Sequence, residues 1–543
     1  MVLKRWELVC ALAGIALVAG GFTARQSLDA GVSDHVLVAG DCAMPMSVIQ
    51  AKEPVGSAVV FHGLNASRQL MFPSGRQIAA LGFDAYLLDA PGHGDSKDRF
   101  SFARAEQCAL AAVDALAARP TISRGRIILL GHSMGGDIAI RAAAQRSVAA
   151  TIAISPGPLY PVPYTPDHLR PYGPPPRYPD NLLVLAGGLD LPGFSDGGKQ
   201  IVERAREHAS LAVFAEVPFA THTGILTRAD TWRRIRGHLS RSAPVREADA
   251  RLWLQFLTLA LPAGVALLFP ATVALVCSLP RYDVGGWIVW LRPFPVIAAV
   301  WLAVAMFVVA VVGFNPSQLP HLYTGTYLKN VLLWSGSLLL TWLLHAELLR
   351  RPAAWGHVAP IGAQPPAETL DDDSNAEGSA EPSTVHRRDR NTLSWLERSA
   401  PFLIGASLGL ATVVALGYAV LGWADMWLSP ERWWRFAYLA AMLFNYFLAE
   451  EIVLEQWPVP RRAPLLRCFV LRAILWAPMV AALWLLESPH VLVLVMAPAF
   501  AVLTVVQRLA ANLIRSRTRT VAAPAIFSAI LAAWLIAALF PLQ

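Results

Sequence analysis

A short glycine-rich segment holds the serine with the clearest chemical context in the chain. Residues Gly131-His132-Ser133-Met134-Gly135 follow an apolar run, Ile127 to Leu130, and precede a segment with helical periodicity. A Gly-x-Ser-x-Gly turn between a strand and a helix exposes its serine at the sheet edge, where the positive end of the helix lies nearby. The glycines are needed because a Cβ would collide with neighbouring backbone. The pattern predicts that Ser133 is a nucleophile.

A serine hydroxyl needs a base, and the base needs an acid that orients it. Of the downstream histidines, His222 lies just past the last predicted strand, in a loop that can reach over the sheet. His208, in a charged helical pattern, and His238, in an Arg-rich stretch, are expected to be solvated. Asp190 ends an apolar run and is expected at the same edge as the serine. Asp196 is the alternative acid, although a helix-capping role fits it better.

Two backbone N–H groups are expected to stabilise a developing oxyanion. One is that of Met134, the residue after the nucleophile. The other is that of Leu64, in the segment His62-Gly63-Leu64-Asn65, which follows the apolar run ending at Phe61. The side chain of Leu64 has no part in this role.

Short apolar runs alternate with helical patterns between about Arg25 and Arg246. Near-continuous apolar strands separated by helices predict an α/β fold, a doubly wound and mostly parallel sheet with helices on both faces. The stretch from Ser155 to Asp180, rich in Pro and Tyr, shows no period and is expected to be a small lid or a plain surface loop. The predicted strands are Ser57 to Phe61, Phe83 to Asp89, Arg126 to Leu130, Ala149 to Ile154, Asn181 to Ala186 and Leu211 to Val217. The predicted helices are Arg104 to Ala118, Gly135 to Arg146 and Lys199 to His208.

Several motifs accompany the serine turn: His62-Gly63, the run from Asp89 to Ser96, Gly187 to Asp190, and His222-Thr223-Gly224. Together they resemble the α/β-hydrolase superfamily, in its lysophospholipase-like and dienelactone-hydrolase-like serine esterase branches. The resemblance implies a Ser133-Asp190-His222 triad and no metal or organic cofactor. It also implies that Asp89 and His93 shape a loop near the site. The superfamily includes peptidases, thioesterases, lipases and cofactor-free haloperoxidases, so the fold does not name the substrate.

The rest of the chain is too apolar for a soluble protein. Of 543 residues, 55% are hydrophobic and 15% charged, where a soluble domain carries about 25% charged residues. Residues 1–24 are expected to be an N-terminal signal anchor (or a signal peptide), 25–246 the hydrolase domain, and 247–543 an all-α membrane domain. A loop near 352–397 is expected to be disordered from its composition. Eight runs are long enough to span a bilayer: 252–278, 293–314, 329–349, 401–422, 434–455, 466–487, 490–510 and 521–541.

The positive charges predict how the chain crosses the membrane. Lys4 and Arg5 precede the first apolar run and should keep the N-terminus inside. Alternation then places residues 25–250 outside, the loop around Asp372 inside and the C-terminus outside. The net charge of +7 is concentrated in Arg residues between apolar runs, which favours membrane orientation over nucleic-acid binding. The Arg residues of the predicted inside loops are Arg281, Arg350, Arg351, Arg387, Arg388, Arg390, Arg398, Arg461, Arg462, Arg515, Arg517 and Arg519.

Three further patterns leave alternatives open. Cys42 and Cys108 could pair in an oxidising compartment, but isolated buried thiols are the favoured interpretation. Glu450 and Glu451 resemble the first motif of CAAX-type intramembrane proteases, which has Arg where this chain has Glu455. No downstream histidine motif accompanies them, so these acids are expected to reach water at a helix end. A tryptophan cluster fits an interfacial belt and comprises Trp423, Trp427, Trp433 and Trp434.

These patterns predict a serine hydrolase held in a bacterial inner or cell membrane, with its catalytic domain facing the periplasm or cell exterior. A small-molecule or lipid-like acyl substrate, cleaved as a carboxylic ester, fits the triad best. The alternatives are a transporter or sensor with a ligand-binding hydrolase-like domain, and an acyltransferase or peptidase that uses the same triad.

Overall fold

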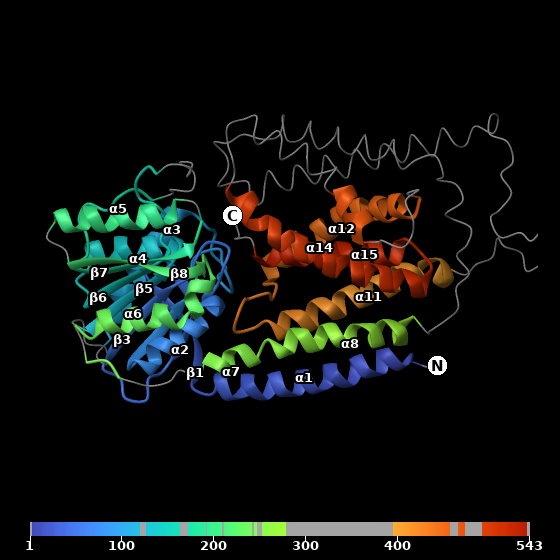
Figure 1. Cartoon of the computed structure of the whole chain (residues 1–543), viewed down its shortest axis with the longest axis horizontal. Helices are drawn as coiled ribbons and strands as arrows, with labels where there is room; N and C mark the ends of the chain where they lie inside the picture. The colour runs from blue at the N-terminus through green and yellow to red at the C-terminus, as the bar shows by residue number, and fades with distance from the viewer. Residues whose placement is uncertain are drawn as a thin grey trace, which may run out of the picture.

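The molecule divides along its long axis into a sheet flanked by helices and a bundle of long helices (Figure 1). The structure is a computed structural model that describes residues 3–119, 126–162, 172–191, 193–208, 211–241, 244–246, 252–277, 395–456, 465–472 and 491–539. The predicted spans 293–314 and 329–349 lie outside these residues. So do most of the predicted span 466–487 and most of the predicted disordered loop at 352–397.

An eight-stranded sheet forms the first unit, in the order β1-β2-β4-β3-β5-β6-β7-β8. Strands β3 to β8 pair in parallel, whereas β1 and β2 form an antiparallel hairpin, and β2 also pairs antiparallel with β4. The strands are β1 (Val32–Ala39), β2 (Cys42–Ile49), β3 (Gly56–Phe61), β4 (Phe83–Leu88), β5 (Ile127–His132), β6 (Ala150–Ile154), β7 (Asn181–Leu189) and β8 (Leu211–Thr221). The predicted α/β fold is therefore confirmed, and the hairpin adds two strands that the apolar runs did not indicate.

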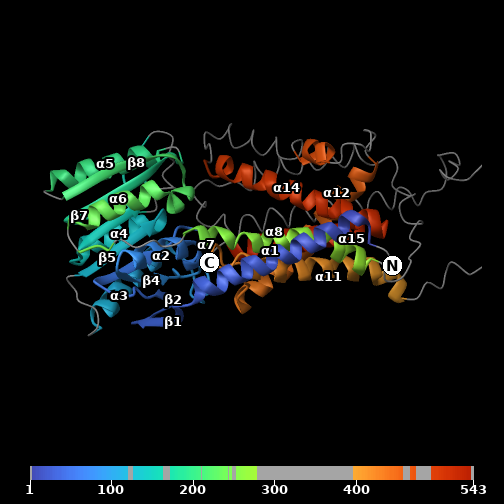
Figure 2. The ribbon, with the colours of Figure 1, turned by 60° about the horizontal axis from the view of Figure 1, so that its bottom comes forward.

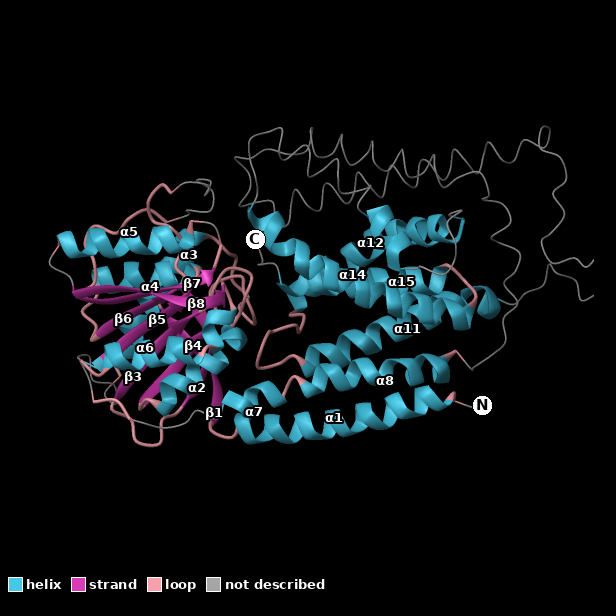
Figure 3. Cartoon of the chain, viewed as in Figure 1, coloured by secondary structure: helices cyan, strands magenta, loops and turns pink. Residues whose placement is uncertain are grey.

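Helices cover both faces of the sheet (Figure 3). One apolar core lies beneath α3, α4 and α5, and the other beneath α2 and α6, because each helix turns one apolar stripe toward the strands. The helices are α2 (Phe72–Ala80), α3 (Phe102–Ala117), α4 (Met134–Gln145), α5 (Phe194–Glu207) and α6 (Ala229–Leu239), with short 3₁₀ turns η1 (Arg68–Met71) and η4 (Gly224–Thr227). Between residues 155 and 180, the described parts 155–162 and 172–180 contain neither helix nor strand.

The second unit is a bundle in which α15 is central. Helix α15 packs against α11 and α12, and α1 packs along α8. The close approach of α1 and α8 depends on glycine, since a Cβ on Gly14 would lie 2.9 Å from the carbonyl oxygen of Gly264. The helices are α1 (Arg5–Asp29), α7 (Leu252–Leu257), α8 (Ala260–Val276), α11 (Trp395–Ala419), α12 (Pro430–Gln456), α14 (Val491–Thr518) and α15 (Ala522–Leu539).

Four helical stretches among the described residues are long and apolar enough to cross a membrane. They are Arg5–Asp29, Trp253–Val276, Ala400–Ala419 and Ala522–Leu539. The predicted spans 252–278, 401–422 and 521–541 match three of them, and the predicted anchor matches the first. Helices α12 and α14 cover the predicted spans 434–455 and 490–510. They are as long as these four stretches but contain several acidic or basic residues.

The expectation that Glu450 and Glu451 reach water is wrong. Their exposed fractions are 5% and 2%. Arg472 holds both carboxylate oxygens of Glu450 at 2.9 Å, and Arg508 binds Glu451 at 2.6 and 3.0 Å. Arginines from residues 465–472 and from α14 therefore neutralise the acids inside the bundle, as buried carboxylates require.

The favoured interpretation of Cys42 and Cys108 as separate thiols is also wrong. Cys42 opens β2, Cys108 lies on the face of α3 that covers the sheet, and the two form a disulfide with a Cα–Cα distance of 5.5 Å. Their separation of 66 residues hid the pairing, because neither carries a local spacing signal.

Candidate active site

Ser133 occupies a sharp turn between β5 and α4. Its backbone angles are φ 54° and ψ −123°, a conformation that non-glycine residues rarely adopt. The flanking glycines make the turn possible, since a Cβ on Gly131 would lie 1.9 Å from the Gly135 carbonyl oxygen, and one on Gly135 would lie 2.4 Å from that of Phe61. The turn thus stores backbone strain at the residue whose hydroxyl it exposes.

Asp190 and His222 meet at the carboxyl ends of β7 and β8. The Nδ1 of His222 lies 2.6 Å from Oδ1 of Asp190. The other carboxylate oxygen accepts a hydrogen bond of 2.5 Å from the Ser155 hydroxyl, and Oδ1 also accepts one of 2.7 Å from the Leu191 N–H. Burial alone would raise the pKa of Asp190, but the hydrogen bond and charge of His222, together with Ser155, lower the pKa below its usual value. The acid is therefore held ionised beside the imidazole.

The imidazole of His222 is held near the Ser133 turn by two neighbours. The Nε2–H of His132 donates to the backbone oxygen of His222 at 2.8 Å, and the two rings are 4.8 Å apart between centroids. The ring of Phe194 meets the imidazole edge-on at 5.0 Å. Burial lowers the pKa of His132 to about 3, so this residue stays neutral. Within the described residues, no hydrogen bond joins Ser133 to His222.

The loop after β3 lies directly against the Ser133 turn. A Cβ on Gly63 would come within 3.1 Å of the Ser133 Cβ, so the segment that carries the predicted Leu64 N–H lies against the serine. Buried His62 and His93 hold the loop: His62 Nδ1–H donates to the Gly63 oxygen at 2.7 Å, and His93 Nε2 accepts from the Asn65 N–H. Burial lowers the pKa of both histidines. In the described part of the chain, neither the Leu64 nor the Met134 N–H has an acceptor.

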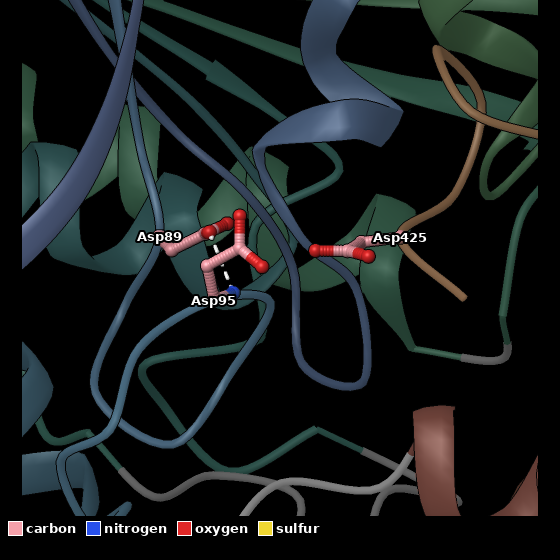
Figure 4. Close-up of side chains that lie close together, drawn as sticks. All are labelled: Asp89, Asp95 and Asp425. Atoms are coloured by element: carbon pink, nitrogen blue, oxygen red, sulfur yellow. Dashed lines mark hydrogen bonds between the residues drawn. The ribbon is translucent and has the colours of Figure 1, made fainter. Parts of the chain in front are cut away.

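A group of carboxylates lies where the loop after β4 meets the connection between α11 and α12, at the junction with the helical bundle (Figure 4). Carboxylate oxygens of Asp89, Asp95 and Asp425 lie within 4.8 Å of one another. Arg68 supplies a balancing charge, pairing with Asp89 and, at 2.8 Å, with Asp95. Burial and the nearby Asp95 and Asp89 raise the pKa of Asp425 to about 7.

The alternative site residues lie elsewhere. Asp196 is the third residue of α5 and pairs with Lys199, so it neither caps the helix nor contacts His222. His208 directly follows α5 and is exposed, as expected. The expectation that His238 is solvated is wrong, since it is 5% exposed. It shares the buried face of α6 with Trp232 and Ile235, and burial lowers its pKa to about 4.

Three residues that position the site were missed from the sequence: Ser155, His132 and Phe194. A signal existed for Ser155, which directly follows the apolar run of β6 and so falls at the same sheet edge as Asp190. No pattern in the sequence could have paired His132 with the backbone of His222, because that contact joins residues 90 apart.

A family model matches part of the first unit. Residues 52–172 match the family described as serine aminopeptidase, S33. Together with the sheet order, this match identifies the first unit as an α/β-hydrolase fold. The search of curated proteins gave no match.

Similar solved structures include small bacterial and archaeal hydrolases. An esterase from Pyrobaculum calidifontis is 16% identical, with a TM-score of 0.33, covering 44% of this chain and 92% of its own. A dienelactone hydrolase from Anabaena variabilis is 18% identical, with a TM-score of 0.30 and coverage of 39% and 97%. An esterase from Pyrococcus furiosus is 18% identical, with a TM-score of 0.34 and coverage of 40% and 95%.

Proposed function

We propose that this chain is a membrane-anchored serine hydrolase that cleaves a carboxylic ester outside the cytoplasm. The observation that carries the proposal is the strained Ser133 turn beside an Asp190–His222 pair joined at 2.6 Å. In the proposed reaction, His222 takes the Ser133 proton as the hydroxyl attacks the ester carbonyl, and the Met134 and Leu64 N–H groups bind the oxyanion. His222 returns the proton to the leaving alcohol, which departs and leaves an acyl-enzyme. The base then activates water, which releases the acid and restores Ser133.

Two observations support an extracytoplasmic site. The Cys42–Cys108 disulfide fits an oxidising compartment. Helices α1, α11 and α15 end toward the sheet, whereas α8, α12 and α14 begin there, so their directions follow the predicted alternation (Figures 1 and 2). In this orientation the basic end of α14, with Arg515 and Arg517, lies on the cytoplasmic side, as the positive-inside rule requires. The packing of α1 along α8 fits an anchor that stays in the chain.

Labelling of the full-length protein with a fluorophosphonate probe tests the proposed nucleophile. We expect the wild-type protein to react and Ser133→Ala to lose all labelling while it still inserts into the membrane. Ser240→Ala, which removes an exposed hydroxyl after α6, is the matched control and should label normally. Labelling that survives in Ser133→Ala would exclude this serine as the nucleophile.

A further inference from the structure

The catalytic edge of the sheet faces the ends of the membrane helices. The carboxyl ends of the parallel strands carry Ser133, Asp190 and His222, and the loops on this edge contact the bundle. Arg432, at the start of α12, donates to the Gly92 oxygen at 2.9 Å, and the Gly422 N–H donates to Gln69 at 2.8 Å. The helices run along the long axis of the molecule, and the sheet lies across one end of them (Figure 1). A bilayer around the helices would therefore have its surface beneath the catalytic edge.

Aromatic residues mark where that surface lies. Trp427, Trp433 and Trp434 stand at the sheet-side ends of the helices, with exposed fractions of 41%, 48% and 81%. Tryptophans concentrate at the headgroup level of a bilayer, where the indole is partly in apolar surroundings and partly in water. Arg432 lies within this cluster and touches the catalytic half of the molecule directly. The triad thus stands just above the headgroup level on the sheet side.

Two exposed apolar side chains flank the triad on the same edge. Leu189, next to Asp190, is 59% exposed, and Phe219, three residues before His222, is 78% exposed. A bulge between β7 and β8 creates this arrangement. Gly187 pairs with Val217 and Leu189 pairs with Thr221, so β8 has more residues than β7 between these two pairs. We call Leu189 and Phe219 the apolar lip.

Phe219 is held in an unfavourable conformation. Its φ is 54°, a region that bulky residues rarely occupy. Backbone strain and an exposed aromatic ring both cost free energy, and their coincidence beside a catalytic histidine is more typical of a functional contact than of a surface accident. Leu211, an exposed apolar residue at the opposite end of β8, does not have a positive φ.

We propose that the apolar lip contacts the outer leaflet and receives the acyl chain of an ester that resides in the bilayer. This inference rests on the proposed serine hydrolase function and names its substrate class. The lip lies beside the triad, so an ester whose carbonyl is at headgroup depth reaches Ser133 while its chain remains in an apolar environment. The leaving alcohol, which is the more polar part, is then released on the aqueous side.

The test uses the full-length protein in nanodiscs of phosphatidylethanolamine and phosphatidylglycerol in equal amounts. The two probes are p-nitrophenyl palmitate dissolved in the bilayer and p-nitrophenyl acetate in water, with nitrophenol release as the readout. Phe219→Asn is the test variant, because asparagine accepts a positive φ while replacing the ring with a polar group. Leu211→Ser is the matched control, an exposed apolar residue of the same strand at the far end.

Phe219→Asn should lower the ratio of palmitate to acetate turnover by about tenfold. Leu189→Ser should also lower this ratio. Leu211→Ser should leave the ratio unchanged. An equal effect of Phe219→Asn on the turnover of both esters, or no effect on either, would contradict the proposal that the apolar lip receives the acyl chain. A wild-type protein that cleaves acetate but prefers it to palmitate would do the same, while leaving the serine hydrolase proposal intact. A wild-type protein that cleaves neither ester contradicts the proposed function itself.

Discussion

The two halves of the catalytic edge are built differently. The loops after β3 and β4 are buried, hydrogen-bonded by His62 and His93, and tied to the helical bundle through Arg432. The end of β7 and β8 is bulged and exposes Leu189 and Phe219 to the surroundings. The first half has the polar partners and burial needed to fix donors for an oxyanion. The second half holds the proposed acid and base but leaves apolar surface open, which suits contact with a substrate.

The largest effect is expected from the acid in the second half. Asp190→Asn should lower kcat by about 10⁴-fold, because His222 loses the partner that fixes its tautomer and stabilises its charged form. Turnover of p-nitrophenyl acetate by the purified protein measures this. Asp196→Asn, a carboxylate of the same stretch that pairs with Lys199, is the control and should change little. If Asp196 proved essential and Asp190 dispensable, the acid would be wrongly assigned.

A smaller effect is expected where β6 supports that acid. Ser155→Gly removes the hydroxyl that donates to Asp190 at 2.5 Å, and glycine accepts the positive φ of 47° at this position. A hydrogen bond to a charged group is worth about 1.5–3 kcal/mol, so kcat should fall about tenfold or more. KM should stay close to that of the wild-type protein. A change confined to KM would show that Ser155 does not act through Asp190.

The smallest effect on catalysis is expected from Asp425, at the junction with the bundle. A change of this residue should alter the stability of the folded protein instead. The folded state raises the pKa of Asp425 from 3.8 to about 7, so the buried carboxyl favours its protonated form. Ionisation therefore destabilises the folded protein progressively as pH rises from about 4 to about 7, by at most about 4 kcal/mol.

Asp425→Asn should accordingly raise the unfolding midpoint at pH 8 and leave it nearly unchanged at pH 4. Thermal unfolding of the full-length protein in detergent at the two pH values measures the difference. Asp230→Asn, a half-buried carboxylate in α6 that pairs with Arg233 and Arg234, should show no such pH-dependent gain. An equal shift at both pH values would contradict a titrating carboxyl at this junction.

The parallel part of the sheet could be predicted because its central strands, β3, β5 and β6, are mostly apolar runs buried on both faces. The hairpin of β1 and β2 could not, since Val36 and Val38 point to solvent and the first half of β1 carries the polar residues Ser33, Asp34 and His35. The proximity of Asp190 and His222 could be predicted because both residues directly follow strands. Ser155 was equally recognisable by that rule, whereas Phe219 was not, because its exposure depends on a bulge that no residue pattern announces.

In the helical bundle, too, local features could be predicted from the sequence but contacts between distant residues could not. Apolar length predicts α1, α8, α11 and α15 well, because hydropathy along one helix is a local property. The burial of Glu450 and Glu451 depends on arginines more than twenty residues away in sequence, at Arg472 and Arg508. Pairings of that kind, like the Cys42–Cys108 bond, become visible only when the helices are placed.

The most direct test of the central claim is to find the acyl group on the enzyme. The full-length protein, mixed with p-nitrophenyl palmitate in nanodiscs and quenched in acid before deacylation, can be digested and its peptides weighed by mass spectrometry. We expect a palmitoyl group on the peptide that contains Ser133. A palmitoyl group on another residue, or ester turnover with no acylated peptide in the wild-type protein, would contradict nucleophilic catalysis by Ser133.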